Sequence, residues 1–219
     1  DSRLPRAVVT GAPVRRALRA LDRGVARDAA RARLGLPAHG TVLLAVGGSL
    51  GSAHLNAVTR ALVARRANDA GLAVLHLAGA RHADAEPPVA TPPGGLAYRR
   101  LAALDDMVDA YAAADLVLAR AGASTVAELA CVGLPSVLVP WRGAADDHQT
   151  ANARWLASRG GAEMVPDDDL EAALVALVAL LDDPSRRAAL ATVARAAGAL
   201  HRAGEVGALV HRVARTGRP

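Results

Sequence analysis

The sequence contains no lysine and no phenylalanine, and aromatic residues make up only 2% of its 219 residues. The core therefore has to be built from Ala, Val and Leu, and the hydrophobic content of 52% suffices for one sizeable domain. All 26 basic residues are arginines, scattered along the chain without interleaved aromatics. Because neither a basic run nor a stacking platform is present, we expect no nucleic-acid partner. The net charge of +5 favours contact with an anionic membrane surface instead.

Cysteine and long apolar runs are scarce as well. The single cysteine, Cys131, excludes an internal disulfide, which is typical of a reducing compartment. No apolar run reaches the ~18 residues of a membrane span, and the N-terminus shows no signal segment. We therefore expect a cytoplasmic protein that is at most peripheral on a membrane. No start Met is present, which leaves open whether the chain is a fragment.

Short apolar runs end in glycine turns and alternate with segments of helical periodicity. This alternation predicts an α/β fold, a Rossmann-like parallel sheet with helices on both faces. Residues 83–95 have the composition of a surface loop, and residues 6–10 could form an additional strand. The predicted strands are 41–46, 73–78, 96–99, 116–119, 136–139 and 162–165. The predicted helices are 53–67, 104–114, 125–132, 148–158, 170–181, 184–197 and 204–215.

Three loops follow predicted strands at one edge of this sheet, where parallel sheets bind ligands. The first loop is Gly47-Gly48-Ser49-Leu50-Gly51. Its glycines let the backbone approach a ligand, and the next helix offers free N–H groups and a positive dipole end that suit phosphate. The spacing is neither GxGxxG nor that of a P-loop, so a plain strand-to-helix turn is an equal alternative.

The second loop, residues 120–128, places another glycine turn before another helix. Thr125 and Glu128 have the spacing of a capping box, in which Glu128 would only cap its own helix. Alternatively, the helix N-terminus binds a phosphate, and Glu128, one turn further, accepts hydrogen bonds from the vicinal hydroxyls of a ribose. The loop taken alone favours the capping box slightly.

The third loop, residues 140–149, is polar. Asp146 or Asp147 could be the N-cap of the following helix. An Asp close to His148 could also suggest a metal, but no further His or carboxylate cluster accompanies it, so we expect no metal. Amide and carboxylate groups in such a loop, Gln149 among them, suit the recognition of sugar hydroxyls.

Five motifs occur in a fixed order along the chain. They are Gly47-Gly48-Ser49-x-Gly51 with Leu55-Asn56, Asp105-Asp106-Met107 with 110–115, 120–129, 133–140, and Ala145-Asp146-Asp147-His148-Gln149 with Asn152-Ala153. In this order and spacing they resemble the C-terminal domain of the bacterial undecaprenyl-diphospho-muramoylpentapeptide N-acetylglucosaminyltransferases. Residues 9–15 resemble the segment that joins the two domains of that family. The resemblance covers nearly the whole chain and implies the C-terminal half of a GT-B fold, in which two Rossmann-like domains face a cleft.

The resemblance divides the chain and assigns its diphosphate and ribose contacts. It implies a linker and domain start over 1–30, a nucleotide-sugar-binding domain over 31–200 and a C-terminal helix over 201–219. Backbone N–H groups of the turn Ala123-Ser124-Thr125 would hold the diphosphate of UDP, together with Gly48 and Ser49. Glu128 would accept hydrogen bonds from the ribose hydroxyls.

Further matching positions concern the base and the sugar. Leu104 lies where the backbone of the family reads uracil, and Met107 would pack beside that base. Gln149, with His148 near it, would meet the hydroxyls of N-acetylglucosamine. Arg15 would approach the donor from the linker.

The implied reaction is transfer of N-acetylglucosamine from UDP-N-acetylglucosamine to a lipid-linked muramoyl-pentapeptide (lipid I to lipid II) in peptidoglycan synthesis, with inversion. It needs no metal and no cofactor, because helix N-termini would stabilise the charge that develops on the leaving UDP. The acceptor hydroxyl needs a general base, and we find no candidate in this chain. The resemblance puts base and acceptor on an N-terminal domain at the inner face of the cytoplasmic membrane. We therefore expect this chain alone to bind the donor and transfer little.

The chain departs from the family pattern at three positions. Ala12 stands where the family usually has Asn, Leu50 where it often has Gln, and His148 where some members carry Gln. The resemblance therefore predicts the UDP part of the donor more firmly than the identity of its sugar. Three alternatives stay open: another GT-B transferase acting on a lipid or natural product, a nucleotide-sugar epimerase using Asp146 and Asp147, and a non-catalytic UDP-sugar-binding subunit that needs a partner chain.

Overall fold

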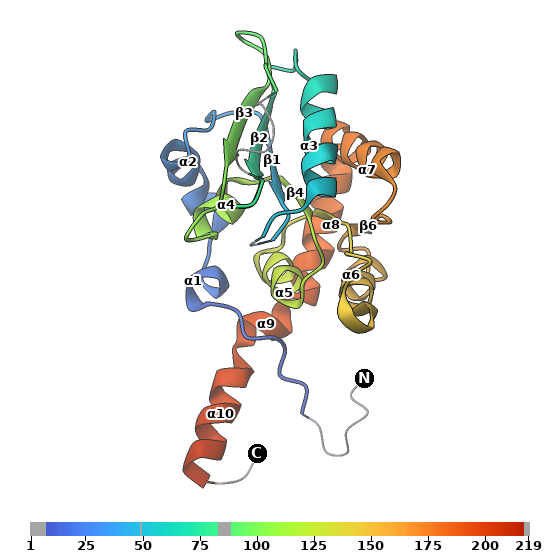
Figure 1. Cartoon of the computed structure of the whole chain (residues 1–219). Helices are drawn as coiled ribbons and strands as arrows, with labels where there is room; N and C mark the ends of the chain where they lie inside the picture. The colour runs from blue at the N-terminus through green and yellow to red at the C-terminus, as the bar shows by residue number, and fades with distance from the viewer. Residues whose placement is uncertain (1–7, 49, 83–88, 217–219) are drawn as a thin grey trace.

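A single six-stranded parallel sheet forms the centre of the computed structural model, which describes residues 8–48, 50–82 and 89–216 (Figure 1). The strand order is β3-β2-β1-β4-β5-β6, and every neighbouring pair is parallel. The strands are β1 (Thr41–Val46), β2 (Leu72–Leu77), β3 (Ala97–Leu101), β4 (Leu116–Ala119), β5 (Ser136–Leu138) and β6 (Glu163–Met164). The predicted parallel α/β sheet is confirmed.

Helices cover both faces of the sheet (Figure 1). Side chains of β1 alternate between the two faces: Leu44 packs into the core beneath α2, α4 and α5, and Leu43 into the core beneath α3 and α7. The helices are α1 (Arg16–Arg19), α2 (Arg23–Arg33), α3 (Ala53–Arg65), α4 (Val108–Ala113), α5 (Ala123–Val132), η1 (Ala145–Asp147), α6 (His148–Ala157), α7 (Leu170–Asp182), α8 (Pro184–Ala197), α9 (Ala199–Ala203) and α10 (Glu205–Thr216).

The strand order contains one topological switch point. The chain builds β1, β2 and β3 outward in one direction and then returns to add β4, β5 and β6 on the other side of β1. Consequently the connections that follow β1 and β4 leave the sheet in opposite directions and open a crevice at their carboxyl ends. The glycine turn after Val46 and the loop after Ala119 flank this crevice.

The N-terminal region differs from the sequence prediction. Residues 8–10 form no strand, while the predicted positions 6 and 7 lie outside the described residues. Two helices that the sequence analysis did not predict follow, α1 and α2. Arg31 of α2 is 1% exposed and anchors the helix, because it pairs with Asp115 at 2.8 Å and donates to the carbonyl of Ala113 at 3.3 Å. Burial lowers the pKa of Arg31, and the adjacent Asp115 carboxylate opposes that shift.

Two helix starts also differ from the prediction. Helix α4 begins at Val108 instead of 104, because the carboxylate of Asp106 accepts the N–H of Val108 at 3.1 Å and holds the preceding turn outside the helix. Helix α5 begins at Ala123 instead of 125, with Gly122 as its N-cap residue. The second shift changes the interpretation of the loop before α5.

The C-terminal helix, α10, agrees with the prediction. In Figure 1 it projects away from the sheet, and none of its residues is buried. Its hydrophobic residues lie along one side, as the periodicity of 204–215 predicts. Among the described helices, none combines the length and the apolar character that crossing a bilayer requires.

Candidate functional site

A cavity of about 580 Å³ lies at the carboxyl ends of β1, β4 and β5. It joins the three loops that the sequence analysis selected, together with the loop that follows β2. Its lining residues are Gly47, Gly48, Leu50, Gly51, Ser52, Ala53, His54, Arg81, His82, Arg120, Gly122, Thr125, Trp141 and Gln149. Three of the predicted site residues therefore share this cavity: Gly48, Thr125 and Gln149.

The first turn brings backbone into the cavity. Gly48 (φ +86°) and Gly51 (φ +79°) both adopt positive φ angles, which glycine accepts without strain. A Cβ on Gly51 would lie 2.2 Å from the carbonyl oxygen of Ala78, whereas a Cβ on Gly48 would meet only open space. Ser52 then caps α3 by accepting the N–H of Leu55 at 3.3 Å. The predicted phosphate contact Ser49 lies outside the described residues.

The start of α5 carries no side-chain cap among the described residues. Gly122 occupies the N-cap position, and the first N–H with an intrahelical partner is that of Val126. The N–H groups of Ala123, Ser124 and Thr125 therefore retain their capacity to bind an anion. The capping-box interpretation is wrong, because the helix starts two residues before Thr125. The carboxylate of Glu128, which would complete the box, is hydrogen-bonded to Tyr111 instead.

Glu128 instead accepts a hydrogen bond from a buried tyrosine. The hydroxyl of Tyr111, a residue of α4 that is 2% exposed, donates to Oε2 of Glu128 at 2.9 Å. Burial raises the pKa of Tyr111, and the charge of Glu128 adds to the shift, so this hydroxyl stays a protonated donor. Among the described residues, Oε1 of Glu128 has no such partner, so one carboxylate oxygen is oriented and the other can accept.

Seven of the predicted site residues that the structure describes do not line the cavity: Arg15, Leu104, Met107, Ala123, Ser124, Glu128 and His148. The guanidinium of Arg15 lies 3.4 Å from the carboxylate of Asp106, with both side chains more than half exposed. Leu104 and Met107 are partly buried and pack against the same core as Tyr111. Arg15 also lowers the pKa of Tyr111 slightly against the dominant effect of burial, which places its charge near the Tyr111–Glu128 pair.

Gln149 connects two of the loops. Its Oε1 accepts the N–H of Trp141 at 3.0 Å and the N–H of Ala121 at 3.2 Å. Asn152 completes this link, because its Nδ2 donates to the carbonyl of Ala121 at 3.1 Å. With its oxygen engaged, Gln149 can offer a ligand only the two N–H donors of its amide.

His148 and the two aspartates before it are exposed. Nδ1 of His148 lies 2.7 Å from the carbonyl oxygen of Ala145, so Nδ1 donates in this contact and Nε2 remains for a ligand. Asp146 (φ 51°) and Asp147 (φ 50°) hold left-handed backbone conformations. Asp147 occupies the N-cap position of α6, but its carboxylate accepts the hydroxyl of Thr150 at 2.6 Å. No group of three or more His, Cys, Asp or Glu that could hold a metal occurs among the described residues.

Arg120 is a lining residue to which the sequence analysis gave no role. Its guanidinium is 13% exposed, donates to the carbonyl of Val139 at 3.1 Å and forms an ion pair with Asp167. The same carboxylate accepts the N–H of Arg142 at 3.1 Å. Arg120 opens the second loop motif, but its partner lies 47 residues further along the chain, so no spacing rule predicts the pair.

The cavity is lined by basic side chains. They are Arg81, Arg120, His54 and His82; the described lining residues include no carboxylate, although Arg120 is paired with Asp167 behind the lining. Nε2 of His54 is buried and has no hydrogen-bond partner in the described structure. Together with the uncapped start of α5, this lining suits a negatively charged ligand.

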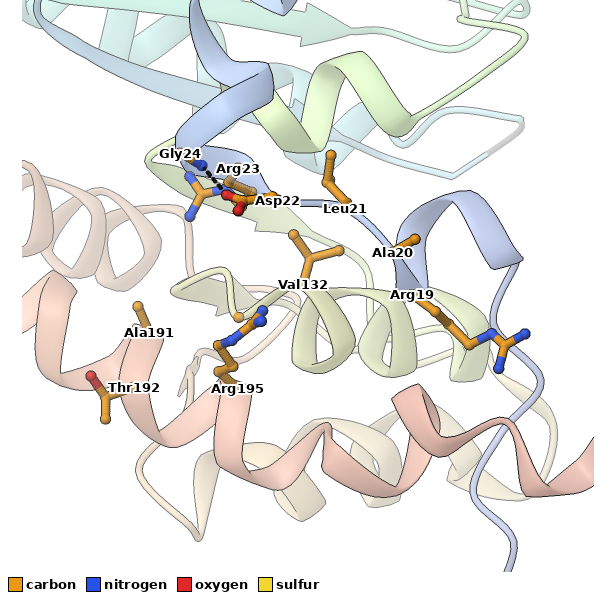
Figure 2. Close-up of a pocket in the computed structure, with 11 residues that line it drawn as sticks. Arg19, Ala20, Leu21, Asp22, Arg23, Gly24, Val132, Ala191, Thr192 and Arg195 are labelled. Atoms are coloured by element: carbon orange, nitrogen blue, oxygen red, sulfur yellow. Dashed lines mark hydrogen bonds between the residues drawn. The ribbon is translucent and has the colours of Figure 1, made fainter.

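A second cavity of about 510 Å³ lies at the opposite end of α5 (Figure 2). Its arginines already have structural roles. Arg23 donates to the carbonyls of Tyr111 (3.1 Å) and Ala114 at the end of α4. Arg195 rises from α8 towards the C-terminal end of α5 (Figure 2), where a positive charge complements the helix dipole. Arg19 points away from this group in Figure 2, so we assign the ligand to the first cavity.

The family model named glycosyltransferase family 28 C-terminal domain matches residues 42–205. The UDP-N-acetylglucosamine–N-acetylmuramyl-(pentapeptide) pyrophosphoryl-undecaprenol N-acetylglucosamine transferase of Mycobacterium tuberculosis (strain ATCC 25618 / H37Rv) is 42% identical over 215 residues. That match covers 94% of this chain and 50% of the relative. The protein of the same name from Rhodococcus jostii (strain RHA1) is 45% identical over 199 residues, covering 90% of this chain and 50% of the relative.

The crystal structure of Acinetobacter baumannii MurG is similar as well. It superposes with a TM-score of 0.64 at 31% identity and covers 81% of this chain and 52% of that chain. The chain thus spans about half the length of the curated relatives it matches. The family model covers all of the sheet except the first residue of β1, and it includes both glycine turns of the cavity. This chain belongs to glycosyltransferase family 28 and contains its C-terminal domain.

Proposed function

We propose that this chain is the donor-binding half of an inverting glycosyltransferase that uses UDP-N-acetylglucosamine. The observation that carries the proposal is the start of α5: three N–H groups without a cap stand next to Glu128, whose carboxylate is oriented by Tyr111. The N–H groups suit a diphosphate, and an oriented carboxylate one turn further suits a vicinal diol. A nucleoside diphosphate contains both groups at neighbouring positions.

The diphosphate would lie between the two glycine turns. The backbone of Gly48 and the start of α5 would donate to its oxygens, and the Arg81 side chain in the lining would attract it. During transfer, negative charge develops on the leaving diphosphate, and oriented donors in a cavity stabilise that charge more than water does. Arg120 would add N–H donors at the wall of the cavity, where its ion pair with Asp167 holds the guanidinium in place.

The nucleoside would lie towards Leu104 and Met107, with Arg15 approaching from the linker. Glu128 would accept from the ribose hydroxyls through Oε1, since Oε2 is bound to Tyr111. Gln149 would contribute N–H donors to the sugar hydroxyls, and Nε2 of His148 would contribute an acceptor. In this assignment, Gln149 also couples the sugar position to the loop before α5 through its bonds to Trp141 and Ala121.

The acceptor is proposed to be a lipid-linked muramoyl-pentapeptide, by analogy with the names of the relatives. The general base and the acceptor contacts would belong to the half of the relatives that this chain does not span. The enzyme would work at the cytoplasmic face of the cell membrane as a peripheral protein, within peptidoglycan synthesis. This 219-residue chain by itself is expected to bind donor and to transfer little sugar.

Calorimetric titration with UDP, UDP-N-acetylglucosamine and UDP-glucose tests the proposal. We expect UDP ligands to bind, and Glu128→Ala to weaken their binding by about 1–3 kcal/mol, the cost of leaving a buried hydrogen-bonding partner unsatisfied. Glu171→Ala is the matched control, because that carboxylate lies on the exposed surface of α7. Absence of UDP binding at millimolar concentration, or equal losses in both variants, would contradict the proposal.

The donor series also distinguishes the proposed transferase from another UDP-sugar transferase. A preference for the N-acetyl sugar over UDP-glucose supports the proposed transferase. Equal binding of both sugars would favour another UDP-sugar transferase of the same fold. For a non-catalytic subunit, the other half would be encoded as a separate chain, and finding that half fused upstream of this sequence would exclude the alternative.

A further inference from the structure

A buried polar relay lies behind the first glycine turn, outside the cavity. It consists of Asn56 on α3, His76 on β2 and Tyr98 on β3. Asn56 is 4% exposed and His76 is 1% exposed, although both carry strongly polar side chains. Tyr98 is partly buried. Buried polar groups are costly unless each finds its partners, so the retention of Asn56 and His76 requires a reason.

The hydrogen bonds of the relay fix which atom donates and which accepts at each step. Nδ2 of Asn56 donates to the carbonyl of Ala78 at 3.1 Å, which turns Oδ1 towards Nε2 of His76 at 2.9 Å. Nε2 must therefore carry the imidazole proton, and Nδ1 accepts from the hydroxyl of Tyr98 at 2.8 Å. Burial lowers the pKa of His76 to about 4, and nearby arginines add to the shift, so the ring is neutral at pH 7. Each polar side-chain atom of the relay thereby has a hydrogen-bond partner.

The sheet register explains why the three side chains meet. Val74 of β2 pairs with Tyr98, and His76 pairs with Arg100, so His76 and Tyr98 project from the same face of neighbouring strands. Their rings lie 6.1 Å apart between centroids and are nearly parallel, at 25°. Helix α3 covers this face and supplies Asn56 from its second turn.

The relay ends on backbone that touches the glycine turn. Ala78 and Gly79 extend the pairing with β3, since their N–H groups donate to Leu101 and Ala102, both at 2.9 Å. The same two residues pack closely against Gly51, since a Cβ on Gly79 would lie 2.2 Å from the Cα of Gly51. The bond from Asn56 thus fixes the wall that supports the turn, and it also fixes the start of α3.

We propose that Asn56, His76 and Tyr98 are positioning residues that hold the turn of Gly48 and Gly51 in the geometry that a nucleoside diphosphate requires. This inference rests on the proposed function. The three side chains act through the backbone of Ala78 and Gly79 and do not line the cavity. They matter because an anion site built from backbone N–H groups depends on the alignment of those groups.

The variant Tyr98→Phe tests the relay at the end furthest from the turn. It removes the hydroxyl that donates to His76 and leaves the ring in place. We expect the Kd for UDP to rise about three- to tenfold, the loss that matches one intramolecular hydrogen bond. We also expect the amide resonances of Gly48 and Gly51 to shift in the unliganded protein. Asn56→Ala should change both quantities in the same direction and further.

Thr59→Val is the matched control on the same helix. Thr59 is fully buried, and its hydroxyl donates to the carbonyl of Leu55 at 2.7 Å, a bond that is not part of the relay. Its loss should lower stability without changing UDP affinity or the glycine resonances. The proposal is overturned if Tyr98→Phe and Asn56→Ala, folded at the assay temperature, bind UDP like wild type and leave the glycine resonances unmoved.

The two levels of inference can fail separately. If the wild-type chain does not bind UDP, the proposed function fails, and the resonances of Gly48 and Gly51 in the unliganded variants then decide the positioning role alone. If the wild type binds UDP and both relay variants bind it equally well, only the positioning role is refuted.

Discussion

Replacing Tyr111 by Phe is the sharpest perturbation that the structure offers. The ring is 2% exposed and is retained by the substitution, so packing changes little. The lost hydroxyl bonds to the charged carboxylate of Glu128 at 2.9 Å, and hydrogen bonds to charged groups contribute about 1.5–3 kcal/mol. Glu128 is only partly buried, so water can replace part of this bond. We therefore expect a loss of about 1–2 kcal/mol in the free energy of unfolding.

The effect on ligand binding is more specific than the effect on stability. Without Tyr111, the carboxylate of Glu128 is free to rotate, and its hydrogen bonds to the ribose weaken. Wild type should therefore prefer UDP over 2′-deoxy-UDP by about tenfold, the worth of one charge-assisted hydrogen bond, and Tyr111→Phe should lose most of that preference. Calorimetric titration with both nucleotides measures the two affinities directly.

A double-mutant cycle with Glu128→Ala tests the coupling between the two residues. If Tyr111 acts through Glu128, the Tyr111→Phe change should have no further effect on UDP affinity in the Glu128→Ala background. Additive losses would show that Tyr111 affects the ligand by another route. Unchanged discrimination between UDP and 2′-deoxy-UDP in Tyr111→Phe would refute the assignment of Glu128 to the ribose.

Three further predictions concern stability and are measured by urea denaturation. The pKa of His76 is about 4 in the folded protein and 6.5 in the unfolded chain, so between these pH values only the unfolded chain binds the proton. The free energy of unfolding should therefore fall by up to about 3 kcal/mol as the pH drops from 6.5 to 4. His76→Gln should make the free energy of unfolding less dependent on pH in this range. Gly51→Ala should cost more than about 3 kcal/mol, because its Cβ would overlap backbone at 2.2 Å, whereas Gly48→Ala should cost about 1–2 kcal/mol. Asp115→Ala should cost about 3–5 kcal/mol, because it leaves the guanidinium of Arg31 buried without its carboxylate.

Each of these predictions has a distinct contrary result. An unchanged slope between pH 4 and 6.5 in His76→Gln would mean that other groups set the acid sensitivity. Equal losses for the two glycine variants would show that the left-handed φ, and not the contact, dominates. Asp109→Ala is the control for the ion pair: Arg33 and Asp109 meet at 2.7 Å but are 58% and 32% exposed, so about 1 kcal/mol or less is expected.

Local patterns predicted most of the fold, because strands and helices of this chain differ in period and are separated by glycine turns. The six strands and their parallel arrangement followed from this alternation. The boundaries of α4 and α5 did not, since they depend on Asp106 and on Gly122. The sequence analysis did not predict α1 or α2. Helix α2 is stabilised by the contact of Arg31 with Asp115, a residue 84 positions away in the chain.

The candidate site was likewise predictable from the sequence only in part. Residue types and their order indicated that the loops after Val46, Ala119 and Val139 belong together, because the carboxyl ends of parallel strands share one edge. Which atom of each side chain is available to a ligand was beyond that reasoning. Gln149 has its oxygen bound to backbone N–H groups, and Glu128 has one oxygen bound to Tyr111.

By itself, the sequence determined the α/β class, the positions of the glycine turns and the resemblance to a glycosyltransferase family, since each depends on residues that are near neighbours in the chain. Only the tertiary structure decided the hydrogen-bond partners of Glu128, Arg120 and His76. Those partners lie on other elements, at separations of 17, 47 and 20 to 22 residues. These partners meet because the burial of the apolar faces of the sheet and helices fixes the elements relative to one another. No local sequence pattern determines which residues of distant elements become neighbours.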